Sequence, residues 1–227
     1  MSQYLKCIEI ETAPKPAAAI IVLHGLGASG DDFVPIAQEM DLGAVGPVRF
    51  VFPYAPQIPV TINGGYVMPA WYDIRGTDLV AREDEAGLRQ SQAAVQALIE
   101  REITRGVPSN RIVLAGFSQG CAMTLMTGLR FDKPLAGLAC LSGYLPLATI
   151  TAGECHSANQ LTPIFMAHGQ QDGVVPINRA TASRDLLLAR GYQIEWHEYP
   201  MAHSVSPQEV AHWNAWLMKV LSVNAIK

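Results

Sequence analysis

Short apolar runs alternate along this chain with longer stretches whose apolar residues recur at helical spacing. Continuous apolar runs of strand length are typical of strands that are covered on both faces, as in a parallel sheet. We predict such strands at 18–23, 111–115, 135–141 and 163–168, and further strands at 48–52 and 193–199. Residues 4–11 instead alternate apolar and polar positions, which predicts a half-buried strand near an edge of the sheet.

Helices are expected between most of these strands. The spacing of apolar residues predicts them at 31–40, 83–105, 121–129, 177–190 and 207–221. Strands that alternate with helices indicate an α/β fold, with a mostly parallel central sheet and helices on both faces. At 227 residues, of which 49% are hydrophobic, the chain has enough apolar surface for one domain over 1–227. It is too short for a separate cap domain.

Two segments lack a clear period. Residues 54–77 contain Pro56, Pro59, Pro69 and the pair Gly64-Gly65, yet they are rich in large apolar side chains. Long loops inside compact domains are usually functional or disordered, and this composition is too apolar for disorder. We therefore expect 54–77 to form a wall that covers the substrate. Residues 148–161 are polar and irregular and are expected to form a surface loop.

The pentapeptide Gly116-Phe117-Ser118-Gln119-Gly120 lies between a predicted strand and a predicted helix. A Gly-x-Ser-x-Gly string occurs by chance, and a serine between glycines is usually a loop residue. In a strand, turn and helix, however, the glycines remove Cβ atoms where the two elements meet, and the turn presents the serine hydroxyl beyond the sheet. This setting favours Ser118 as a nucleophile.

An aspartate and a histidine follow in the order that a serine hydrolase of the α/β type requires. Asp172 lies in a loop after the strand at 163–168, where parallel sheets place their sites, although Asp before Gly is also an ordinary turn residue. Of three later histidines, His197 falls in a strand and His212 in a helix. His203 lies in the connection between them and is our candidate for the base.

The glycine-rich segment 24–30 follows the first long strand. It lacks the Lys-Ser/Thr ending of a Walker loop and the Gly-x-Gly-x-x-Gly spacing of a dinucleotide fold, so a phosphate cradle is the weaker reading. We expect the backbone N–H of Leu26 to contribute to an oxyanion hole. His24, which precedes the serine in the chain, is expected to pack this loop through hydrogen bonds.

The chain carries 16 basic and 20 acidic residues, and neither sign forms a block. Nucleic acid is therefore an unfavoured partner. Cys7, Cys121, Cys140 and Cys155 are scattered and are expected to be reduced. The sequence shows no signal peptide and no apolar run of transmembrane length, so we expect a cytoplasmic protein.

With these residues placed, the chain resembles the phospholipase/carboxylesterase family of α/β-hydrolases, which includes acyl-protein thioesterases and small bacterial carboxylesterases. The resemblance covers nearly the whole chain. It rests on His24-Gly25-Leu26-Gly27, Gly64-Gly65 with Met68 and Trp71-Tyr72-Asp73, the Ser118 pentapeptide, Ser142-Gly143-Tyr144-Leu145-Pro146, His168-Gly169, Asp172-Gly173-Val174-Val175-Pro176 and His203.

The resemblance implies a Ser118, Asp172 and His203 triad, with backbone amides of Leu26 and Gln119 in the oxyanion hole. It also implies Trp71 in the acyl-binding wall, and we add Met68 and Val175 as substrate-binding residues. We expect no cofactor and no metal.

The expected function is hydrolysis of short- to medium-chain acyl esters through an acyl-enzyme. An acyl-protein thioesterase or a lysophospholipase for long acyl chains is the alternative, with transient contact to a lipid surface. Two rivals are a cysteine hydrolase that uses Cys121 and a binding module without catalysis. Trp213 and Trp216 fit either a core or the interface of a homodimer.

Overall fold

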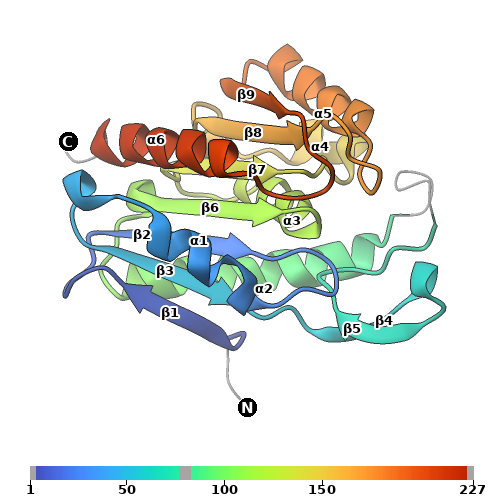
Figure 1. The fold of residues 1–227 in the computed structure, drawn as a ribbon, viewed down its shortest axis with the longest axis horizontal. Helices are drawn as coiled ribbons and strands as arrows, with labels where there is room; N and C mark the ends of the chain where they lie inside the picture. Colours follow the sequence, from blue (N-terminus) through green and yellow to red (C-terminus); the bar gives the residue numbers. More distant parts are fainter. Residues whose placement is uncertain (1–3, 77–82, 224–227) are drawn as a thin grey trace.

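The computed structural model describes residues 4–76 and 83–223. Its main sheet contains seven strands in the order β1-β3-β2-β6-β7-β8-β9 (Figure 1). The strands of this sheet are β1 (Cys7–Glu11), β2 (Ala18–Leu23), β3 (Val48–Pro53), β6 (Ile112–Phe117), β7 (Gly137–Leu141), β8 (Ile164–Gly169) and β9 (Ile194–Tyr199). Only β1 runs antiparallel to its neighbour, and it lies at an edge as the sequence predicts.

Helices cover both faces of this sheet, which confirms the predicted architecture. The helices are α1 (Val34–Glu39), α2 (Glu85–Thr104), α3 (Gln119–Gly128), α4 (Ala148–Glu154), α5 (Ile177–Ala189) and α6 (Pro207–Val223). Short 3₁₀ turns are η1 (Gly30–Phe33), η2 (Gly43–Val45), η3 (Thr61–Asn63), η4 (Ser109–Arg111) and η5 (Ser157–Asn159). In Figure 1, α1 and α6 lie in front of the sheet, and α2 and α3 lie behind it.

The period of two along the strands divides the core into two clusters. Ala19, Ile21 and Leu23 of β2 pack with the buried residues of α2 and α3. The alternate residues of the same strand pack with α1 and α6 on the opposite face. Because β2 has buried side chains on both faces, its sequence reads as a continuous apolar run.

Trp213 and Trp216 lie on the sheet-facing side of α6, with 1% and 3% of their surface exposed. They belong to the core of this chain. This placement decides between the core and interface readings that the helical spacing leaves open.

Two segments differ from the sequence-based expectation. Within 54–76, β4 (Gln57–Val60) and β5 (Tyr66–Pro69) pair as an antiparallel hairpin, whereas no period was evident in the sequence. The prolines and the short strands hide the alternation, since pairing here spans only four residues per strand. Residue 77, the end of the expected wall, lies outside the described residues.

The expected surface loop at 148–161 begins with the helix α4. Thr151 of α4 is buried and accepts a hydrogen bond from Arg130, whose guanidinium also pairs with Glu154 at 2.7 Å. Arg130 follows α3 in the chain, so this helix is held by a distant side chain. Local composition gave little sign of it.

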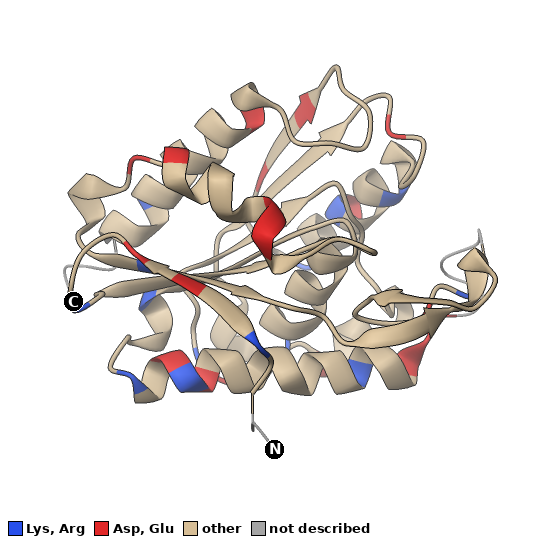
Figure 2. Cartoon of the chain, turned by 60° about the horizontal axis from the view of Figure 1, so that its bottom comes forward, with Lys and Arg blue, Asp and Glu red and all other residues tan. Residues whose placement is uncertain are grey.

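Charged residues of both signs are mixed along α2, as Figure 2 shows on the long helix at the bottom of the view. One of these charges is buried: Glu102 pairs with Arg49 of β3 at 2.6 Å. In the described part of the chain, no helix is both long and apolar enough to cross a membrane.

Candidate active site

Ser118 sits at the turn between β6 and α3 with a strained backbone, at φ 56° and ψ −117°. The glycines on either side leave room for this turn. A Cβ atom on Gly116 would lie 2.2 Å from the carbonyl oxygen of Gly120, and one on Gly120 would lie 2.0 Å from that of Leu23. The Ser118 amide donates to Leu141 O at 2.9 Å, which fixes the turn to β7.

The structure brings Ser118, His203 and Asp172 together in one hydrogen-bonded chain. His203 Nε2 lies 2.9 Å from Ser118 Oγ, and His203 Nδ1 lies 2.6 Å from Asp172 Oδ2. A carboxylate can only accept, so Nδ1–H donates to Asp172 and Nε2 accepts the Ser118 proton. This arrangement lets the imidazole remove the proton from the serine hydroxyl.

Asp172 is buried and is fixed by backbone amides. Its Oδ1 accepts hydrogen bonds from the N–H of Val174 at 2.9 Å and of Val175 at 2.8 Å. The other oxygen is left for His203. The carboxylate therefore has a defined orientation, and each oxygen has a partner.

His168, at the end of β8, supports the same loop, although the sequence analysis gave it no role. Its Nε2 lies 2.7 Å from Val175 O and 3.4 Å from Asp172 Oδ2. Burial lowers the pKa of His168, so the imidazole is held neutral and Nε2–H donates to Val175 O. In the sequence, the position of His168-Gly169 at the end of a predicted strand was the signal that could have indicated this role.

The loop that carries His203 connects β9 to α6 and is fixed by its backbone. Gln170 N donates to Tyr199 O at 2.8 Å, and Gln171 N donates to Met201 O at 3.0 Å. The Phe117 ring contacts the His203 ring with centroids 4.7 Å apart.

The two other histidines that follow Asp172 lie elsewhere. His197 is in β9, and His212 of α6 has its Nδ1 2.9 Å from the Tyr199 hydroxyl. Neither of them contacts Ser118.

Leu26 and Gln119, whose backbone amides are predicted to form the oxyanion hole, both line the pocket together with Ser118. Gln119 is the first residue of α3, and Leu26 lies in the turn after β2. Within the described residues, neither amide N–H has a hydrogen-bond acceptor. An unpaired donor at a helix N-terminus suits a developing negative charge.

His24 packs the Leu26 turn, in agreement with the sequence-based expectation. Ala55 N donates to His24 Nε2 at 3.0 Å, so the proton is on Nδ1, which donates to Gly25 O at 2.7 Å. Burial lowers the pKa of His24, and this neutral tautomer satisfies both ring nitrogens. Both are occupied by structural hydrogen bonds.

The side chain of Gln119 has a role that the sequence analysis missed. Its Oε1 accepts from Trp71 N at 2.8 Å, and its Nε2 donates to Tyr72 O at 2.7 Å. The residue after the nucleophile thus holds the segment 71–72 against the site. Its position in the pentapeptide was the only sequence signal.

Trp71 lies behind the site and not in the expected acyl-binding wall. Its side chain is 1% exposed, and Nε1–H donates to His24 O at 2.8 Å. The Ser91 hydroxyl donates to the Trp71 carbonyl. The hydrogen bond from the indole to His24 O therefore fixes the turn that contains Leu26.

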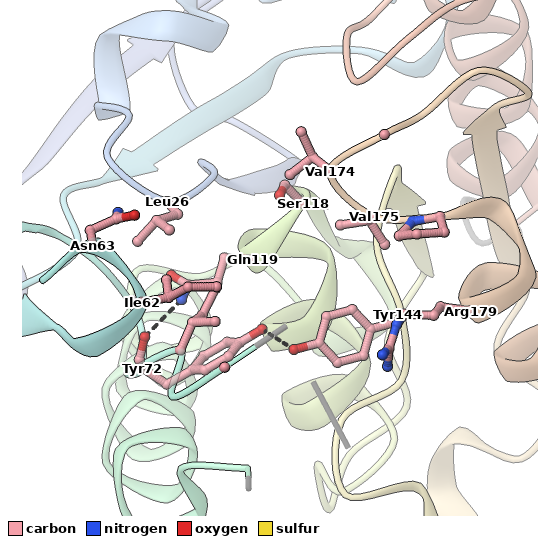
Figure 3. A pocket seen from close by; sticks show the side chains of 14 residues that line it. Leu26, Ile62, Asn63, Tyr72, Ser118, Gln119, Tyr144, Val174, Val175 and Arg179 are labelled. Carbon is pink, nitrogen blue, oxygen red and sulfur yellow. Dashed lines mark hydrogen bonds between the residues drawn. The ribbon is translucent and has the colours of Figure 1, made fainter. Parts of the chain in front are cut away.

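A pocket of about 400 Å³ opens beside Ser118 (Figure 3). Its lining residues are Leu26, Ile62, Asn63, Tyr72, Ile74, Gly76, Ser118, Gln119, Tyr144, Gly173, Val174, Val175, Pro176 and Arg179. Val175 lines this pocket as expected from the sequence, whereas Met68 and Trp71 are not among the described residues that do.

The four cysteines are free, and Cys121 is buried without lining the pocket. In the described residues, no group of three or more His, Cys, Asp or Glu side chains could hold a metal ion. Ser118, Leu26 and Gln119 line the pocket, and the His203 imidazole with its Asp172 carboxylate is joined to Ser118 by a hydrogen bond. This set can attack a carbonyl and stabilise the tetrahedral oxyanion.

Comparison with known proteins points to one family. A family model described as Phospholipase/Carboxylesterase matches residues 5–221. Acyl-protein thioesterase 1 of Yarrowia lipolytica is 38% identical over 215 residues, which is 92% of this chain and 95% of that protein. The protein of the same name from Neurospora crassa is 41% identical, over 88% of this chain and 86% of its own length.

Solved structures show the same fold. Arabidopsis thaliana SOBER1 superposes with a TM-score of 0.85 at 32% identity, over 90% of this chain and 99% of that one. Zea mays acyl-protein thioesterase 2 gives a TM-score of 0.83 at 26% identity, over 96% of this chain and 100% of that one.

Proposed function

The chain belongs to the phospholipase/carboxylesterase family of serine hydrolases, and we propose that it cleaves acyl esters and thioesters through an acyl-enzyme on Ser118. The observation that carries this proposal is the continuous hydrogen-bonded chain from Ser118 through His203 to Asp172.

In the first step, Ser118 Oγ attacks the carbonyl carbon while His203 Nε2 takes its proton. Asp172 keeps the proton of His203 on Nδ1 and stabilises the imidazolium that forms. His203 then gives the proton to the leaving alcohol or thiol, and the acyl group stays on Ser118. Water repeats the sequence and releases the acid.

The amides of Leu26 and Gln119 stabilise the oxyanion in both steps. Each such donor contributes on the order of 3 kcal/mol to the transition state. Because the Gln119 side chain is hydrogen-bonded to the 71–72 backbone, the amide of the same residue is held in place before substrate arrives.

We assign the acyl group to the pocket beside Ser118. Its volume of about 400 Å³ supports short to medium acyl chains. The leaving group then lies toward solvent, where its size is less restricted. This orientation of the substrate accommodates a small alcohol, a lysolipid or a protein thiol as the leaving group.

Protein thioesters are the second candidate substrate, because the similar curated proteins are named acyl-protein thioesterases. Lysophospholipids are a further variant of the same site. Ile62 and Val174 at the pocket rim and Tyr66 and Val67 on the nearby hairpin expose apolar surface suited to transient lipid contact.

The test combines covalent labelling with a substrate series. A fluorophosphonate should label the wild type and a Ser157→Ala control, which changes an exposed serine outside the pocket, but not Ser118→Ala. The kcat/KM is then measured for nitrophenyl esters from acetyl to palmitoyl and for one palmitoyl thioester. The series shows which acyl length the enzyme prefers. Labelling or turnover retained in Ser118→Ala would refute the mechanism, provided that its circular dichroism matches the wild type.

A further inference from the structure

Two buried tyrosines meet in the pocket wall. The hydroxyl oxygens of Tyr72 and Tyr144 are 2.9 Å apart, and both residues line the pocket beside Ser118. Figure 3 shows the two phenols pointing toward one another, joined by a dashed line. They come from segments 72 residues apart in the chain, so the pair is made by the tertiary structure.

Tyr72 and Tyr144 belong, with Gln119 and Val175, to the buried part of the lining, which we call the floor of the pocket. Tyr72 is 3% exposed and Tyr144 is 6% exposed, whereas Val174 and Ile62 in the same lining are 66% and 43% exposed. Exposed members form the rim, and buried members form the inner end. An acyl chain that enters past the rim therefore reaches the phenols as it lengthens.

The backbone at or next to both tyrosines is held by hydrogen bonds. Tyr72 O accepts a hydrogen bond from Gln119 Nε2 at 2.7 Å. Next to Tyr144, Leu145 N donates to Ser183 Oγ at 2.9 Å. Because the backbone is fixed on both sides, the floor cannot retreat easily before a longer chain.

The pair has one more donor than it uses. Two phenols carry two protons, and their mutual hydrogen bond takes one of them. Within the described residues, neither hydroxyl has another hydrogen-bond partner. Burial raises the pKa of Tyr144 to about 12 and raises that of Tyr72 well above its usual value, so both stay protonated. One O–H thus remains a donor at the floor.

The surroundings of this donor are polar on one side. Arg179 lines the pocket beside Tyr144 in Figure 3 and is the charged side chain of the lining. A purely apolar chain end that covered the remaining phenol O–H would remove it from water without a replacement acceptor, which is unfavourable. A chain end that carries an acceptor oxygen would satisfy the phenol.

We propose that the Tyr72–Tyr144 pair is a specificity element that favours acyl groups carrying a hydrogen-bond acceptor near their far end over plain alkyl chains of equal length. The inference rests on the proposed function, since it concerns the acyl pocket of the same reaction. It defines the substrate class as medium-length acyl groups with a distal oxo, hydroxyl or similar oxygen.

The experiment compares matched pairs of nitrophenyl esters from pentanoyl to octanoyl, each plain or with a ketone oxygen on the carbon before the last. Each kcat/KM is divided by the alkaline hydrolysis rate of the same ester. At the length that reaches the floor, we expect the wild type to favour the oxo ester about five- to tenfold, as one satisfied buried donor allows.

The double variant Tyr72→Phe/Tyr144→Phe removes both hydroxyls and keeps the rings, and its oxo preference should fall to one or below. Tyr192→Phe, which removes the hydroxyl of another buried tyrosine outside the lining, should keep the wild-type ratio. A wild-type ratio at or below one throughout the series would overturn the proposal without any variant. An unchanged ratio in the double variant would also overturn it. Absence of all ester cleavage would instead refute the proposed function.

Discussion

The serine turn and the segment 54–76 both line one pocket, but different kinds of interaction give them their shape. The turn depends on its own glycines: a Cβ on Gly116 would meet Gly120 O within the turn, and a Cβ on Gly120 would meet Leu23 O of β2. The segment is shaped by distant partners, because Gln119 and His24 hold Trp71, and Asp84 holds Asp73 N at 3.0 Å. The attacking group is thus encoded locally, whereas the wall that selects the acyl group depends on long-range contacts.

A pair of glycine substitutions tests this difference between the serine turn and the segment 54–76 with the largest expected effect. Gly120→Ala puts a Cβ 2.0 Å from a backbone oxygen, so we expect a loss of at least about 3 kcal/mol in the free energy of unfolding, and loss of turnover. Gly64→Ala, in the hairpin, has open space around its Cβ and a φ of 67°. It should cost only about 1 kcal/mol. Urea unfolding of both variants measures the difference, and equal losses would contradict it.

The next largest effect is expected on kcat. Asp172→Asn keeps the shape of the carboxylate but presents an amide to His203, which favours the wrong tautomer, so kcat should fall about 10⁴-fold. The kcat is measured with a short nitrophenyl ester. Asp132→Asn, at an exposed position, is the matched control and should retain the wild-type kcat. A loss below tenfold in Asp172→Asn would argue against the assigned role.

Gln119→Ala tests the connection between the two regions. It leaves Trp71 N and Tyr72 O buried without partners and should cost about 2–4 kcal/mol in the free energy of unfolding. Because the pocket floor is displaced, KM for longer acyl esters should rise more than KM for acetyl esters. Gln208→Ala, at an exposed position in α6, serves as the control. A uniform change of KM with acyl length would show that Gln119 does not position the wall.

The smallest effect concerns Asp73, which accepts hydrogen bonds from Thr61 N and Thr61 Oγ1, both at 2.7 Å. Burial raises its pKa, but the Thr61 hydrogen bonds and the nearby Arg75 outweigh burial, so the pKa is lowered overall. The carboxylate therefore stabilises the fold above its unfolded pKa of about 4, and this contribution is lost as the pH falls through the folded pKa.

Asp73→Asn should accordingly destabilise the protein by about 1 kcal/mol at neutral pH, and the difference from wild type should vanish in acid. The measurement is the unfolding free energy of both proteins across that pH range. A difference that persists unchanged at low pH would exclude the ionised carboxylate as its cause.

Much of the site could be predicted because its groups follow strand ends. Ser118 comes directly after β6, and Asp172 and His203 lie in the loops that follow β8 and β9; the structure brings the three side chains together. The β4–β5 hairpin and α4 could not be predicted in the same way. Their strands and helix are too short to show a period, and contacts such as Arg130 to Thr151 stabilise them.

Trp71 shows that a sequence can indicate that a residue lies near the site without indicating which role its side chain has there. Its apolar surroundings in the sequence suggested a substrate wall, but its N–H groups bind Gln119 and His24, which places the indole behind the pocket. Tyr72, the next residue, lines the pocket instead. Hydrophobicity alone could not distinguish these neighbours.

The sequence by itself determined the order of the strands of the main sheet and of the longer helices, the buried character of the central strands and the serine turn, because period, apolar runs and glycine spacing are local properties. Only the tertiary structure decided which side chains close the pocket, that Gln119 holds its wall and that two tyrosines meet at its floor. These contacts join residues dozens of positions apart, and no local pattern records such a pairing.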